Sequence, residues 1–188
     1  MKKITLCFLC AVLMLGCVPS WNPLYTDKDV VFDPALIGVW ATDNDKESWD
    51  FSKDGEKAYK LVQIDHDGHR AEFAVHLVKL KDTRFLDLYL TKATDAKFNG
   101  LAAFSLLPAH LFLKVQQIGP VLQMAVMDPD WLKEYLEKNP KAIRHEKLEE
   151  GRIVLTAATA DLQKFVLEHA KEKLFGDTAD LKRKPRTN

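Results

Sequence analysis

Five side chains in the sequence carry groups that exchange protons or hydrogen bonds with ligands, and the expected strand pattern brings them to one surface. They are Tyr59, His76, Asp87, Tyr89 and His110. In that pattern His76 lies opposite Tyr59 on one strand and opposite Tyr89 on the next, with Asp87 diagonal to it. An imidazole held by a carboxylate between two phenols donates and accepts hydrogen bonds, so the sequence predicts a ligand-binding surface here. A satisfied polar network under a helix, or a solvated sheet face, would use the same residues.

The strand pattern follows from three turn signals in the middle of the chain. Asp54-Gly55 and Asp67-Gly68 suit two-residue hairpin loops, and a third tight turn is expected at Asp82-Thr83. Such loops fix the register and define one face that is almost wholly apolar, because side chains alternate across a strand. That face, the expected core, consists of Trp49, Phe51, Val62, Ile64, Phe73, Val75, Leu77, Leu86, Leu88 and Leu90.

The rest of the chain predicts further strands and two helices. The first helix, 129–138, has Asp128 as its N-cap and Pro129 at its first position. The second helix covers about 160–175 and ends before Gly176. The further strands and a short hairpin are expected at 101–106, 110–118, 120–127 and 143–155.

Other clusters of reactive residues have simpler explanations. Asp65-His66-Asp67-Gly68-His69 holds two His and two Asp, but a tight hairpin points them to alternate faces, so no metal site is predicted. No serine stands in a Gly-x-Ser-x-Gly motif, and the sequence has no glycine-rich phosphate loop. We therefore expect no catalytic residue and no cofactor. An enzyme whose reactive groups converge from distant segments stays open as an alternative.

The N-terminus has the pattern of an export signal. Lys2 and Lys3 precede an uncharged run over 4–16, which has the length of a secretory signal and is too short to span a membrane. The run ends in Leu13-Met14-Leu15-Gly16-Cys17, which resembles the lipobox of bacterial lipoproteins. This resemblance implies cleavage before Cys17 and acyl chains such as palmitate on Cys17, which anchor the protein to a membrane. Val18 follows where an Asp would signal inner-membrane retention, which implies the periplasmic face of the outer membrane in a Gram-negative host.

A second resemblance concerns the fold. Gly38-Val39-Trp40, ahead of an antiparallel meander with a late helix, is similar to the Gly-x-Trp opening of lipocalin-like barrels. The resemblance implies that Trp40 closes one end of a barrel. We expect a mainly β (α+β) fold, in which the antiparallel meander curls into a lipocalin-like barrel or a strongly bent sheet, with two helices. The expected divisions are a signal peptide at 1–16, a lipidated tether at 17–34, one domain at 35–182 and a basic tail at 183–188.

Charge and composition narrow the function. The chain has 27 basic and 27 acidic residues, which does not suit a nucleic-acid binder. A hydrophobic content of 47% supports a true core. Together with the expected anchor and the lack of catalytic motifs, this predicts a non-catalytic binding module of the cell envelope for an apolar or amphipathic small molecule. A structural lipoprotein that docks another envelope protein is the alternative.

Overall fold

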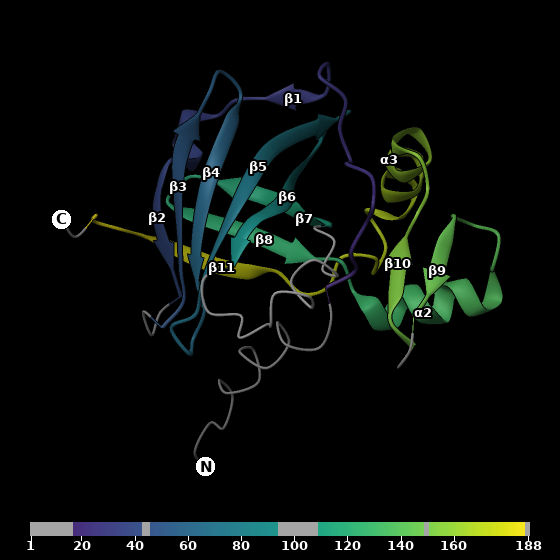
Figure 1. Cartoon of the computed structure of the whole chain (residues 1–188). Coiled ribbons are helices and arrows are strands. Elements are labelled where there is room, and N and C mark those ends of the chain that lie inside the picture. The colour runs from purple at the N-terminus through teal and green to yellow at the C-terminus, as the bar shows by residue number, and fades with distance from the viewer. Residues whose placement is uncertain (1–16, 43–45, 94–108, 149–150, 187–188) are drawn as a thin grey trace, which may run out of the picture.

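The computed structural model describes residues 17–42, 46–93, 109–148 and 151–186 (Figure 1). The strand expected at 101–106 and the expected signal peptide at 1–16 lie outside these residues. No helix within them is both long enough and apolar enough to cross a membrane.

Eight antiparallel strands close into a barrel, which confirms the mainly β fold and selects the closed barrel over the bent sheet. Their order around the barrel is β5-β4-β3-β2-β11-β8-β7-β6, and the pairing of β5 with β6 closes the ring. A two-residue strand, β1 (Val30–Val31), pairs with β5 at one end. The barrel strands are β2 (Gly38–Ala41), β3 (Ser48–Asp54), β4 (Ala58–Ile64), β5 (Arg70–Leu80), β6 (Thr83–Ala93), β7 (His110–Ile118), β8 (Val121–Val126) and β11 (Ala179–Lys184).

The hairpin loops differ in length from the two-residue turns expected at 54–55 and 67–68. Asp54 pairs with Ala58, which leaves a three-residue loop, and Ile64 pairs with Arg70, which leaves a five-residue loop. The longer loop begins early because one Asp65 carboxylate oxygen accepts hydrogen bonds from the backbone N–H groups of Asp67 and His69, both at 2.9 Å. The expected turn at 82–83 is displaced by one residue, since Leu80 pairs with Thr83.

Because of these loop lengths, β4 directs the opposite set of side chains into the barrel from the set expected, whereas its neighbours β3 and β5 direct the expected side chains inward. Tyr59 and Leu61 are fully buried inside the barrel, whereas Val62 and Ile64, expected in the core, lie on the outer face and are half-buried. The changes in the loops before and after β4 cancel each other in the register of β5 relative to β3. Phe51 of β3 and Val75 of β5 therefore both face the core as predicted.

One end of the barrel is closed around Trp40, as the lipocalin resemblance implied. Trp40 is fully buried, and its indole N–H donates to the Leu36 carbonyl of a short 3-10 helix, η2 (Pro34–Leu36). The Arg183 guanidinium lies 4.2 Å from the centre of the Trp40 ring. Gly38 allows this approach, because a Cβ there would lie only 2.5 Å from an Arg183 nitrogen and the backbone φ is +137°.

A second core lies outside the barrel, under the helices. α2 (Pro129–Lys138), α3 (Thr159–His169) and the hairpin of β9 (His145–Lys147) and β10 (Ile153–Leu155) stand together on one side of the barrel (Figure 1). Their apolar side chains pack with outward-facing residues of the barrel wall, among them Val78, Phe85 and Phe112. α2 has the predicted bounds and the predicted Asp128 cap. α3 ends earlier than 175, because the chain turns after Ala170 and brings Phe175 against Phe85.

The first and last of the described residues belong to the folded body. Within the segment expected to be a tether, Val18, Ser20 and Leu24 are buried, and the Ser20 N–H donates to the His110 carbonyl at 2.9 Å. At the other end, β11 includes Arg183 and Lys184 of the expected basic tail and fills the gap between β2 and β8. The barrel would stay open without β11.

Candidate functional site

Four of the five predicted site residues come together on the outer wall of the barrel. On the paired strands β5, β6 and β7, His76 lies directly opposite Asp87 and not opposite Tyr89 as expected, because the β5–β6 turn is displaced. Tyr89 lies opposite Ala74 on β5 and opposite His110 on β7. Tyr59 does not join them, because the reversal of β4 turns its side chain into the barrel core. His76 therefore faces Ala58 on β4 in place of the expected phenol.

Asp87 is the centre of this group and is almost completely enclosed. Its side chain is 1% exposed, and each carboxylate oxygen has a partner. One oxygen accepts a hydrogen bond from the Leu24 N–H at 2.7 Å, and the other lies 2.6 Å from His110 Nδ1. Burial of a carboxylate is costly unless such partners are present. Asp87 thus fastens the N-terminal segment to the barrel wall.

Aromatic rings surround the Asp87–His110 pair. The Tyr25 ring lies 4.2 Å from that of His76, and the Tyr89 ring lies 4.8 Å from that of His110. Burial lowers the pKa of His76, although the nearby Asp87 charge acts in the opposite direction. Burial likewise raises the pKa of the Tyr25 hydroxyl. This geometry favours the interpretation of a satisfied polar network, here under the N-terminal segment, over that of a ligand-binding surface.

A second site lies at the closed end of the barrel. A cleft of about 510 Å³ opens between β1 with η2 on one side and the β5–β6 hairpin on the other. One part of its lining is apolar, and the other part carries both positive and negative charges. The lining residues are Val31, Phe32, Asp33, Pro34, Leu77, Lys79, Asp82 and Arg84.

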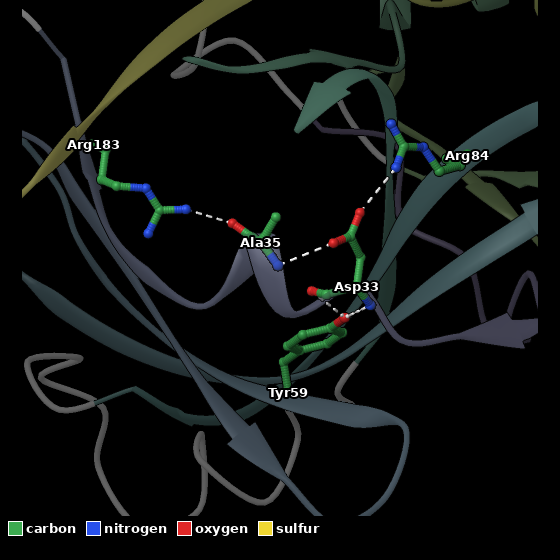
Figure 2. A network of polar contacts seen from close by, with 5 residues as sticks. All are labelled: Asp33, Ala35, Tyr59, Arg84 and Arg183. Atoms are coloured by element: carbon green, nitrogen blue, oxygen red, sulfur yellow. Dashed lines mark hydrogen bonds and ion pairs between the residues drawn. The ribbon is translucent and has the colours of Figure 1, made fainter. Parts of the chain in front are cut away.

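Asp33 organises the wall of this cleft (Figure 2). Its carboxylate accepts a hydrogen bond from the Ala35 N–H at 3.0 Å and pairs with Arg84 at 3.2 Å. Its backbone N–H donates to the Tyr59 hydroxyl at 2.6 Å, and that hydroxyl donates in turn to the Asp33 carbonyl at 3.1 Å. Burial raises the pKa of Tyr59, which keeps this hydroxyl protonated and able to donate.

Arg183 holds the far side of the same short helix. Its guanidinium donates to the carbonyls of Ala35 at 2.5 Å and Ile37 at 2.8 Å while it covers Trp40. η2 is therefore fixed from both sides, by Arg84 through Asp33 and by Arg183 (Figure 2). η2 thus forms a wall of the cleft that is held by several contacts, and the chemistry of the cleft suits a molecule with both apolar and charged parts.

The loop at 65–69, for which the sequence predicted no metal site, has a different geometry from the one expected. Ligand atoms of Asp65, Asp67 and His69 lie within 4.8 Å of one another, so the side chains converge and do not point to alternate faces. The Asp65 carboxylate is already engaged by two backbone N–H groups and by His69 Nδ1 at 3.1 Å. These contacts account for the cluster as a turn-stabilising arrangement, and the absence of a metal stays a prediction.

Sequence reasoning did not find the cleft. Asp33 lay within the expected tether, and the sequence pattern alone places nothing opposite the β5–β6 turn. The one signal was Asp33-Pro34, because an Asp before a Pro is typical of a helix start. A short helix at that point would have carried the chain across the barrel end ahead of Trp40.

The fold and the cleft together define the class of protein: an eight-stranded antiparallel barrel of lipocalin-like architecture with helices on its outer wall. Comparisons with protein-family models, with curated proteins and with solved structures found no match to this chain.

Proposed function

We propose that the protein is a cell-envelope lipoprotein, anchored through acyl chains on Cys17, that binds an amphipathic small molecule without catalysis. The cleft at the closed end of the barrel is the observation that carries the binding proposal. Its volume of about 510 Å³ lies within the range of small-molecule sites, which is roughly 300 to 1,000 Å³. In a Gram-negative host, its place is the periplasmic face of the outer membrane.

The lining of the cleft suggests the kind of molecule. Phe32, Pro34 and Val31 offer apolar contact, while the opposite wall carries two positive side chains, Lys79 and Arg84, and one negative side chain, Asp82. Arg84 has five N–H donors and uses one on Asp33, so others remain for a carboxylate or phosphate. An apolar body with an anionic head matches both walls.

The barrel interior next to the cleft is less suited to a ligand. Below the cleft, the interior is filled by side chains that are fully buried, including Phe51, Tyr59, Leu77 and Leu86. A ligand there would have to displace packed core atoms, which costs several kcal/mol for each large side chain. The cleft needs no such rearrangement.

Native mass spectrometry tests the binding proposal directly. The protein would be purified from its own membranes in mild detergent and measured before and after organic extraction. Lys79→Gln removes a charge from the cleft, and Lys81→Gln removes one from the same hairpin outside the lining. We expect a retained mass in the natural protein and in Lys81→Gln, and a reduced one in Lys79→Gln. Equal retention in both variants would place the ligand elsewhere. No retained mass in the folded natural protein would favour the docking of an envelope protein instead.

A further inference from the structure

The residues that follow Cys17 leave no free linker between the proposed anchor and the barrel. Val18, the next residue, is 3% exposed, and Ser20 is fully buried. One extended residue spans at most about 3.6 Å, so acyl chains on Cys17 would begin within a few ångströms of the folded surface. A lipidated form of this protein therefore cannot stand away from the membrane on a flexible tether.

Exposed aromatic side chains lie at the same place. Among the described residues, three large apolar or aromatic side chains are exposed, and Trp21 is the most exposed of them at 62%. Tyr89, which is 37% exposed, is linked to the residue before Trp21 through the sheet, because Tyr89 pairs with His110 and His110 pairs with Ser20. Two of the three thus flank the start of the fold.

Trp and Tyr are the side chains that gather at the boundary between lipid and water, because each ring is apolar on one part and carries a hydrogen-bonding group on another. Moving an exposed Trp side chain from water into the headgroup layer requires little free energy, and its insertion adds to the attachment that acyl chains provide.

We propose that the end of the barrel around Cys17, Trp21 and Tyr89 lies directly on a lipid surface, with both aromatic rings in the headgroup region. This inference rests on the proposed lipidation of Cys17. It also sets the orientation of the molecule. Arg84 of the cleft and Tyr89 lie five residues apart on β6, roughly 17 Å along the strand. The cleft therefore lies about that far from the proposed membrane contact, which leaves it clear of the headgroup region.

Quenching of tryptophan fluorescence by brominated lipid tests the inference. The processed full-length protein would be reconstituted into vesicles of phosphatidylethanolamine and phosphatidylglycerol, with and without bromine on the acyl chains. Trp21→Phe removes the proposed membrane reporter, and Trp131→Phe, which removes a half-buried Trp of α2, is the matched control. We expect the bromolipid quenching to be largely lost in Trp21→Phe and unchanged in Trp131→Phe.

The outcomes separate this inference from the proposed function. The intact mass of the same sample shows whether Cys17 carries acyl chains. A lipidated protein whose quenching is the same with and without Trp21 would overturn the membrane-facing orientation alone and leave a protein partner as the occupant of this surface. A protein without lipid on Cys17 would overturn the anchor itself. Because Trp21 is largely exposed, its replacement by Phe leaves the fold intact, and urea unfolding checks this.

Discussion

Replacing Asp87 by Ala removes the carboxylate that joins the N-terminal segment to the barrel wall. The change leaves two groups without their partner, the buried Leu24 N–H at 2.7 Å and the partly buried His110 ring nitrogen at 2.6 Å. Hydrogen bonds to a charged group contribute about 1.5 to 3 kcal/mol each, so two of them correspond to roughly 3 to 6 kcal/mol. The whole domain is expected to have a free energy of unfolding of only about 5 to 15 kcal/mol.

Urea unfolding followed by tryptophan fluorescence measures this loss. Asp87→Asn keeps one acceptor oxygen and is expected to cost about half as much as Asp87→Ala. Asp50→Ala is the matched control, because Asp50 forms an exposed ion pair with Arg186 and such pairs contribute about 1 kcal/mol or less. Hydrogen exchange adds a local readout, since the Leu24 amide should exchange much faster in Asp87→Ala. A loss of stability no larger than that of Asp50→Ala would refute the assignment of Asp87 as the fastening residue.

Three further predictions concern other parts of the fold. Arg183→Ala removes the cover of Trp40 and the hydrogen bonds to the carbonyls of Ala35 in η2 and of Ile37 just after it. We expect a loss of about 1 to 3 kcal/mol in urea unfolding, which Arg183→Lys restores only in part. Burial holds the pKa of His76 below its usual 6.5, so the folded state favours the neutral ring. Thermal unfolding should therefore show that the protein loses stability as the pH falls below about 6.5, and that His76→Gln loses less. Burial raises the pKa of Glu47 above 4.5, which destabilises the charged form in the fold; Glu47→Gln should therefore raise the melting temperature at neutral pH, with the gain vanishing in acid.

The barrel was predictable from the sequence to the extent that its turns are local. Alternation of apolar residues gave the inward face of β3, β5 and β6, since each depends on side chains within one strand. The face of β4 was wrong because loop length decides it, and the five-residue loop depends on how the Asp65 carboxylate captures two backbone N–H groups. The Asp67-Gly68 pair is compatible both with a two-residue loop and with a five-residue loop, so it does not decide the loop length.

The closing strand and the N-terminal segment show a different limit. β11 reads Ala-Asp-Leu-Lys-Arg-Lys, and within it Leu181 alone is buried, so its sequence has no apolar pattern. It becomes a strand because two distant strands, β2 and β8, leave an open edge that its backbone satisfies. The N-terminal segment likewise finds its partners, Asp87 and His110, more than 60 residues away along the chain.

The candidate site was predictable in part for the same reason. The prediction put the correct side chains on the outer face of β5, β6 and β7, although the predicted loop lengths were wrong. For this reason it correctly grouped His76, Asp87, Tyr89 and His110 on one face. What fills the surroundings of Asp87 was not predictable, since Leu24 arrives from a segment without strand or helix signals. The cleft depends on the same segment and on the short helix that follows it.

Every functional proposal places this protein on a membrane through Cys17, and the intact mass of the protein isolated from its own host tests that claim most directly. We predict a chain that begins at Cys17 and carries additional mass that alkaline hydrolysis of ester-linked acyl chains reduces. The Cys17→Ala variant should keep its first 16 residues and carry no such mass. A natural protein that retains those residues, or that is cut elsewhere and bears no lipid, would contradict the account.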